Sequence, residues 1–143
     1  MEIVNSPSNN IESNINYKVF VDDSIIPLNG KKPLIINGSC FIPVRPAIEA
    51  MGYSGEWIEA ENRYDIHVNR CTISVMPGSQ IAKVNNQTVN MAGPVILEKG
   101  SLFVHPDFFN KVLSGAIFSD GKGKVEITSP FKLLIDSGFI CLP

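Results

Sequence analysis

An internal repeat is the feature that most constrains the fold of this chain. Residues 21–46 and 84–108 follow the same succession: a polar pair between strand-like residues, two short apolar runs separated by a Gly-Ser step, and a proline-led helix. The polar pairs are Asp22-Asp23 and Asn85-Asn86, whose residue types favour tight hairpin turns. A pattern that recurs at this spacing predicts two copies of one supersecondary unit.

A short helix is expected in each copy after the Gly-Ser strand. In the first copy, Pro43 and Pro46 fit the opening turn, where a missing N–H group costs nothing, and Gly52 ends the helix. In the second copy, four apolar residues form one helical stripe: Phe108, Phe109, Val112 and Leu113.

Alternating strands at 64–68 and 124–128 close the two copies. The pattern predicts an α+β fold of two related β-β-α-β-β units, with repeat 1 at about 17–76 and repeat 2 at about 80–128. We expect antiparallel sheets with the short helices packed on one face.

Both ends of the chain differ from this repeated region. Residues 1–16 are rich in Asn and Ser and show no strand or helix period, which predicts a flexible N-terminal arm. Residues 129–143 form an apolar tail, too short to span a bilayer, that we expect to pack on the domain as an extra strand. No basic and apolar leader follows Met1, so the sequence leaves the localisation open between the cytoplasm and a mature exported piece.

Residues 28–68 carry a run of consecutive motifs. They are Asn37-Gly38, Phe41-Ile42-Pro43-Val44-Arg45, Glu49-Ala50-Met51-Gly52 and Glu56-Trp57, followed by an alternating strand. Through these motifs the chain resembles the copper amine oxidase N-terminal-like domain, a module of Gram-positive envelope and secreted proteins. The resemblance extends over residues 17–128 if the degenerate second copy is included, where His105, Asp107 and Phe118-Ser119 depart from the pattern.

The resemblance implies a non-catalytic, stalk-type module with an accessory or adhesion role, and it implies no enzyme activity. It also implies a place in the cell envelope or outside the cell. The chain has three cysteines, and an odd number is more typical of a reducing compartment.

Composition argues against a nucleic-acid partner and against a membrane span. Twelve Lys and Arg against 14 Asp and Glu give a net charge of -2, and no basic cluster is longer than Lys31-Lys32, so we expect no nucleic-acid partner. No apolar run approaches the roughly 20 residues that span a bilayer, so we expect no membrane span.

A copper site is the first possibility that the family resemblance raises. The candidate donors are two histidines, three cysteines and two methionines: His67, His105, Cys40, Cys71, Cys141, Met76 and Met91. None of them stands in a His-x-His, Cys-x-x-Cys or Met-x-Met spacing. We therefore predict no metal site and no cofactor, with His67 solvated on a sheet and His105 at the start of a helix.

The sequence also contains no catalytic constellation, so we predict that the protein is not an enzyme. Cys71 follows His67 by four residues, which on one extended strand leaves the two side chains about 13 Å apart. Carboxylates at Asp22-Asp23 and within 56–61 lie where solvation is expected. The stretch 121–124 lacks the Walker spacing and is interpreted as a hairpin turn.

Two cysteines, Arg45 and Trp57 each have a structural and a functional interpretation. Cys40 and Cys71 share the phase of apolar neighbours and are interpreted as core residues, with a bridge between them left open. For Arg45 we favour a stem over apolar surface and a head paired with carbonyls or a carboxylate, and for Trp57 a place in the core between helix and sheet. The alternative is a platform of Trp57, Tyr53 and Tyr64 on which a glycan ring stacks.

These observations together predict a non-catalytic binding or scaffold module that holds a partner protein or a cell-wall polymer. Antiparallel sheets leave edges that can pair across subunits, which is compatible with a homo-oligomer. The alternative is a cytosolic inhibitor or small-ligand-binding protein with the same fold, supported by the Met1 start and the three thiols.

Overall fold

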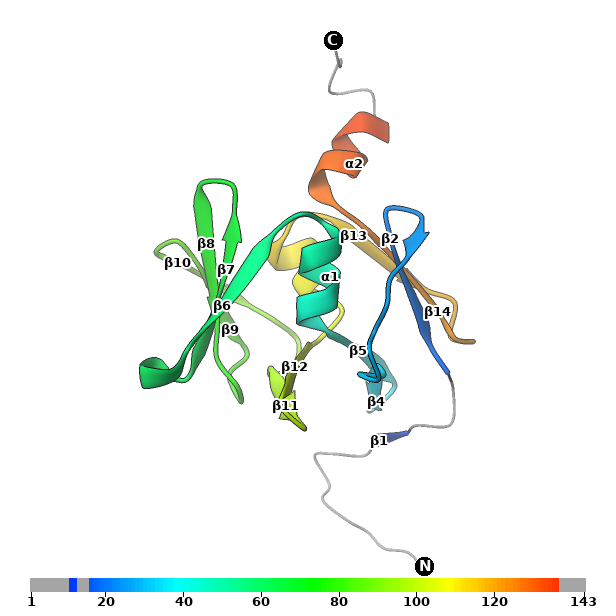
Figure 1. Cartoon of the computed structure of the whole chain (residues 1–143), viewed down its shortest axis with the longest axis horizontal. Helices are drawn as coiled ribbons and strands as arrows, with labels where there is room; N and C mark the ends of the chain where they lie inside the picture. Colours follow the sequence, from blue (N-terminus) through cyan, green and yellow to red (C-terminus); the bar gives the residue numbers. More distant parts are fainter. Residues whose placement is uncertain (1–10, 13–15, 137–143) are drawn as a thin grey trace, which may run out of the picture.

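β-Strands dominate the fold. The computed structural model describes residues 11–12 and 16–136, and in this part of the chain the strands form three sheets while the helices are few and short. Figure 1 shows two sheets on either side of a helical centre, with the remaining sheet, called the central sheet below, underneath that centre.

The central sheet joins two hairpins. Its strands, in order across the sheet, are β1 (Ile11–Glu12), β4 (Leu34–Ile36), β5 (Ser39–Pro43), β12 (Ser101–Val104) and β11 (Ile96–Glu98). The turns Asn37-Gly38 and Lys99-Gly100 have positive φ at both residues, as a two-residue hairpin of type I′ requires. The hairpins meet where β5 and β12 run antiparallel, with Ile42 opposite Val104.

A second sheet forms one side of the molecule. Its strands, in order, are β10 (Gln87–Asn90), β9 (Ile81–Val84), β8 (Cys71–Val75), β7 (Arg63–Val68) and β6 (Ser54–Ile58). All neighbouring pairs in this sheet are antiparallel. Tyr64, Ile66 and Val75 are buried on its inner face, as the alternation in the sequence predicts.

The third sheet brings the two ends of the domain together. Its strands, in order, are β13 (Ala116–Ser119), β14 (Lys124–Thr128), β2 (Lys18–Val21) and β3 (Ser24–Ile25). β14 and β2 run parallel, with Val125 opposite Val19 and Ile127 opposite Val21, and all four side chains are buried. The first hairpin therefore completes a sheet with the last one.

The structure has four helical segments, and the first and third of them lie where the sequence predicts a short helix. They are α1 (Val44–Ala50), the 3-10 turn η1 (Glu59–Glu61), the π-helical turn η2 (Phe108–Val112) and α2 (Pro130–Asp136). α1 follows Pro43 and stops before Gly52, which has a φ of +88°. All four residues of the predicted second stripe are buried, although the backbone there forms a π-turn instead of an α-helix.

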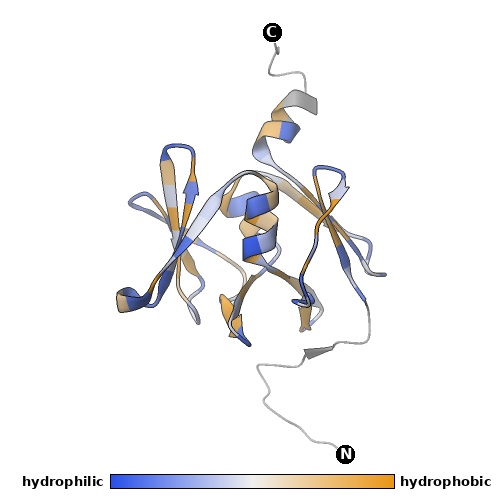
Figure 2. Ribbon diagram, viewed as in Figure 1, coloured by the Kyte–Doolittle hydropathy of each residue, from blue (hydrophilic) through white to orange (hydrophobic). Residues whose placement is uncertain are grey.

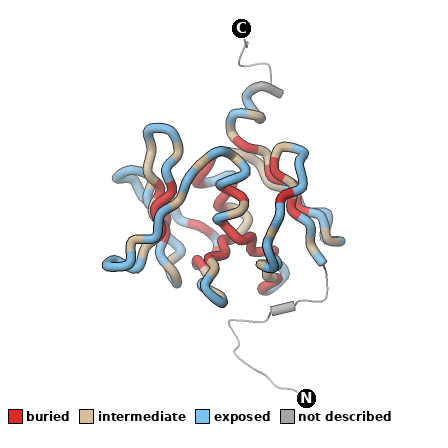
Figure 3. Tube along the Cα trace, viewed as in Figure 1, coloured by how far each residue is buried: buried red, intermediate tan, exposed pale blue. Residues whose placement is uncertain are grey.

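The core lies where the inner faces of the sheets meet α1 and η2. Ile48 of α1 and Phe108 and Phe109 of η2 have no exposed surface. The two phenylalanine rings meet edge to face, with centroids 5.4 Å apart. Figure 2 shows apolar residues on the strands and helices that surround this centre, and Figure 3 shows the buried stretches gathered there.

The predicted α+β class is wrong, because the protein is mostly β, with three sheets and few short helices. The prediction also assumed that each unit forms its own sheet. Instead, the hairpin β6–β7 joins β9–β10 through β8, and β13–β14 joins β2–β3. The sheets are therefore shared between the two halves, and α1 and η2 lie between sheets instead of covering one face (Figure 1).

Apart from η1, the order of elements in residues 18–68 recurs in residues 81–128. Each stretch contains two hairpins, a helical segment and a third hairpin: β2–β3, β4–β5, α1 and β6–β7, then β9–β10, β11–β12, η2 and β13–β14. That the two halves superpose as repeats stays a prediction, as do the domain bounds 17–128.

The last described element differs from the expected strand. Residues 130–136 form helix α2, and Ser129 N–H donates a hydrogen bond of 2.8 Å to Asp22 Oδ1 in the β2–β3 turn. No helix of the described residues is long and apolar enough to cross a membrane. Residues 1–10, 13–15 and 137–143, and with them most of the predicted arm, the end of the tail and Cys141, lie outside the described residues.

Candidate binding groove

A groove with a volume of about 790 Å³ lies beside α1. Four parts of the fold form its walls: α1, the β6–β7 hairpin, the β11–β12 hairpin, and the loop between β3 and β4. Ligand sites typically occupy roughly 300–1,000 Å³ and combine apolar walls with a few polar groups. This groove is therefore the candidate functional site.

Trp57 belongs to the wall of the groove. It is 37% exposed, and its indole Nε1–H donates to Glu59 Oε1 at 2.9 Å. The favoured prediction that Trp57 fills the core between helix and sheet is therefore wrong. Its cross-strand partner Tyr64, only 5% exposed, takes the buried place.

Tyr64 also lines the groove, with its ring buried. Its Oη is buried and has no hydrogen-bond partner among the described residues. Gly55 on β6 makes room for this ring, because a Cβ there would overlap Tyr64 Oη and Cζ. Burial raises the pKa of Tyr64, while the charge of Arg45 lowers it and that of Glu49 raises it.

Arg45 and Glu49 form the rim of the groove on α1. Their exposed side chains are joined by an ion pair, Arg45 Nε to Glu49 Oε2, of 3.2 Å. The predicted pairing of Arg45 with a carboxylate is confirmed. Exposed pairs of this kind contribute only about 0–1 kcal/mol, so either side chain can turn toward a ligand at little cost.

The alternative platform of three aromatic rings does not form. Tyr64 is buried and Tyr53 packs against the core without lining the groove, so the three rings do not make one exposed surface. Leu97 and Ser101 of the β11–β12 hairpin form a further wall. Sequence reasoning missed this wall, because it reaches α1 only through the pairing of β5 with β12.

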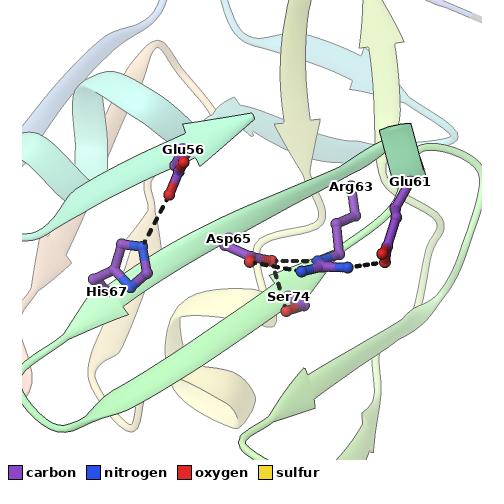
Figure 4. Close-up of polar contacts among 6 residues, drawn as sticks. All are labelled: Glu56, Glu61, Arg63, Asp65, His67 and Ser74. Atoms are coloured by element: carbon purple, nitrogen blue, oxygen red, sulfur yellow. Dashed lines mark hydrogen bonds and ion pairs between the residues drawn. The ribbon is translucent and has the colours of Figure 1, made fainter. Parts of the chain in front are cut away.

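A polar network covers the outer face of the β6–β7–β8 strands (Figure 4). Asp65 accepts hydrogen bonds from Arg63 Nε and Ser74 Oγ, both at 2.8 Å. The hydrogen bond from Ser74 joins β8 to β7. The hydrogen bond from Arg63 is the main cause that lowers the pKa of Asp65, with smaller contributions from Ser74 and the nearby positive charges against an opposing effect of burial.

The glutamates that the sequence places within 56–61 point to different partners. Glu56 lies 3.7 Å from His67, Glu59 accepts from Trp57, and Glu61 pairs with Arg63 (Figure 4). General acid and base catalysis needs two such groups to converge on one reacting bond. These three carboxylates do not converge.

Acid is expected to destabilise the protein through Asp65. Its folded pKa lies below the ordinary value of 3.8, so its ionised form stabilises the fold above that value and the stabilisation is lost as the pH falls through the folded pKa. Asp65→Asn and Arg63→Gln should each reduce the loss of unfolding free energy as the pH falls below the ordinary value of 3.8, measured by urea unfolding. Arg45→Gln should keep the wild-type slope. An unchanged acid slope in Asp65→Asn would contradict this account.

The histidines lie in separate environments. His67 is exposed on β7, as predicted. His105 lies just before η2, with Nδ1 2.9 Å from Asp107 Oδ1 and its ring against Phe41. Among the residues that the structure describes, no group of three or more His, Cys, Asp or Glu side chains could hold a metal ion.

The two described cysteines are unbridged. Burial raises the pKa of Cys40 to about 12, which keeps it as an unreactive thiol. Cys71 is partly buried at the start of β8. The distance of about 13 Å predicted between His67 and Cys71 assumed one continuous strand, whereas the chain turns at 69–70 and Val68 lies opposite Cys71.

The remaining motifs form turns, as predicted. Asp22 and Asp23 both have positive φ and connect β2 to β3. Asp120 Oδ1 accepts hydrogen bonds from the backbone N–H groups of Lys122 and Lys124 at 2.7 and 3.0 Å, which closes the turn before β14.

Comparison with known proteins yields one family. The family model described as the copper amine oxidase N-terminal domain matches residues 9–128. No curated protein matches the chain. The matched region includes every residue that lines the groove, and it agrees with the resemblance that the motifs in 28–68 indicate.

Proposed function

The chain belongs to the copper amine oxidase N-terminal domain family, a non-catalytic part of those oxidases, and on this premise we propose that it acts as a binding module. The observation that carries the proposal is the groove beside α1. Exposed Trp57 and Leu97 offer apolar surface on two of its walls, and burial of such surface by a partner is favourable. The module holds its partner there and performs no chemistry on it.

A cell-wall polymer is the partner that the groove favours. Its rim is made of exposed side chains, Arg45, Glu49 and Trp57, so a long chain can lie across it without entering a closed pocket. The same residues supply a donor, an acceptor and an aromatic ring, which suit a polymer of polar rings.

Co-sedimentation with purified Gram-positive cell walls tests this function. We expect the wild-type chain to sediment with the walls and Trp57→Ala to bind about tenfold more weakly, because a stacking contact is lost. The unfolding free energy of Trp57→Ala should fall by only about 1–2 kcal/mol, since the side chain is partly exposed. Phe118→Ala removes a more exposed ring outside the groove and should bind as the wild type does.

A protein partner is the second candidate, and one observation favours it. Four residues lie opposite one another in a row across the third sheet, on its outer face: Phe118, Glu126, Phe20 and Ile25. Phe118 and Ile25 are both largely exposed, as at the centre of many protein interfaces before association. A chain that stays in the supernatant with cell walls would overturn the polymer function and leave this face as the site to test.

A further inference from the structure

We propose that the groove beside α1 binds a glycan chain, with one sugar ring stacked on Trp57 and one sugar hydroxyl hydrogen-bonded to Tyr64 Oη. The inference rests on the proposed function, because it names the chemistry of the partner that the module holds. It depends on an exposed indole, a buried hydroxyl without a partner in the described chain, and a rim that offers both hydrogen-bond donors and acceptors.

The indole of Trp57 is placed for stacking. Its hydrogen bond to Glu59 holds the ring in one orientation, and its exposure leaves ring surface for a ligand. Trp57 and Tyr64 lie directly opposite each other on β6 and β7, so a sugar on the indole also lies beside Tyr64. The C–H groups on one face of a pyranose ring pack well on the electron-rich face of an aromatic ring.

The hydroxyl of Tyr64 supplies the second contact. Buried polar groups in native proteins are nearly always hydrogen-bonded, and this Oη has no partner within the described residues although Tyr64 lines the groove. A sugar hydroxyl both donates and accepts, so it can complete either role of a tyrosine hydroxyl. Arg45 and Glu49 of the α1 rim line the same groove as Tyr64.

The polar groups of the groove favour a chain rich in hydroxyl groups. Arg45 and Glu49 form an ion pair on α1, and Lys31 adds a further donor to the lining. Arg45 offers donors and Glu49 offers acceptors, and sugar hydroxyls can satisfy both. A proline-rich peptide also docks on aromatic grooves, but its prolines have no N–H group to donate to Glu49. The polar groups of the groove therefore fit a glycan better.

The fluorescence of Trp57 tests the glycan contact directly, because the chain has one tryptophan. Addition of a chitin or cellulose tetrasaccharide to the full chain should change the emission saturably. Tyr64→Phe removes only the hydroxyl, so it should weaken tetrasaccharide binding about tenfold. The same variant should melt at an equal or higher temperature, since it removes an unsatisfied buried group. Tyr53→Phe, outside the groove, is the matched control and should leave the affinity for the tetrasaccharide unchanged.

A Tyr64→Phe variant that binds the tetrasaccharide more weakly but melts at an equal or higher temperature separates a ligand contact from a structural role. A Tyr64→Phe chain that binds the tetrasaccharide as tightly as the wild type would overturn the hydroxyl contact. A saturable response to a proline-rich peptide, with none to either tetrasaccharide, would replace the glycan by a peptide. If the wild-type chain sediments with cell walls but no tetrasaccharide changes the emission, the inference is wrong and the proposed function stands. If it does neither, both are wrong.

Discussion

Replacement of Phe109 by alanine is expected to lower the free energy of unfolding by about 3–5 kcal/mol, the usual cost of truncating a fully buried phenylalanine. Phe109 has no exposed surface and packs edge to face on Phe108, at the point where the sheets meet η2. Its carbonyl also accepts the N–H of Gly115 at 2.8 Å, which orders the chain before β13. A cavity at this position therefore weakens the packing of the whole centre. Urea denaturation followed by circular dichroism measures the loss.

Phe118→Ala is the matched control for this experiment, since it makes the same chemical change on the surface. Phe118 is 62% exposed on β13, so we expect a change within about 0.5 kcal/mol. Similar losses in Phe109→Ala and Phe118→Ala would show that the core is not centred on η2.

Local features of this fold could be predicted from the sequence because they depend on neighbours in the chain. The polar pair Asp22-Asp23 forms the predicted turn, and the apolar stripe from Phe108 to Leu113 is buried as predicted. The stripe alone does not distinguish an α-helix from a π-turn, because a segment of five residues buries the same side chains in either form.

The fold class could not be predicted in this way, because it depends on contacts between distant strands. The parallel pairing of β14 with β2 joins residues that lie more than a hundred positions apart. Each of these strands shows only its own alternation, which identifies the inner face but not the neighbouring strand. The two short helices therefore suggest an α+β class, whereas the strand pairings that join the two halves into shared sheets leave no local signal in the sequence.

The sequence predicts one part of the candidate site, its aromatic residue, but not where that residue lies. Trp57 is an obvious aromatic candidate, but its residue type favours the core as much as a binding surface. The useful signal is Gly55, two positions earlier, because a glycine inside a strand often marks the close approach of another group. Here that group is the ring of Tyr64, and its burial leaves Trp57 on the wall of the groove.

Substitution of Gly55 by alanine is accordingly expected to destabilise the protein by about 1–3 kcal/mol, as overpacking of a filled site does. The added Cβ would overlap Tyr64 Oη and Cζ, and the buried ring has little room to move. The backbone is not the cause, since Gly55 is outside the positive-φ region and alanine can adopt its conformation. Ser54→Ala, on the next residue of β6 and exposed, should change the unfolding free energy by less than about 0.5 kcal/mol.

A double-mutant cycle with Tyr64→Val isolates the clash, because valine keeps the strand preference at this position but does not reach Gly55. In the Tyr64→Val background, Gly55→Ala should stabilise the protein by up to about 0.5–1 kcal/mol, since alanine loses less backbone entropy than glycine within a strand. The same substitution thus changes sign with the residue opposite Trp57. If Gly55→Ala destabilises both backgrounds equally, the ring of Tyr64 does not occupy the space above Gly55.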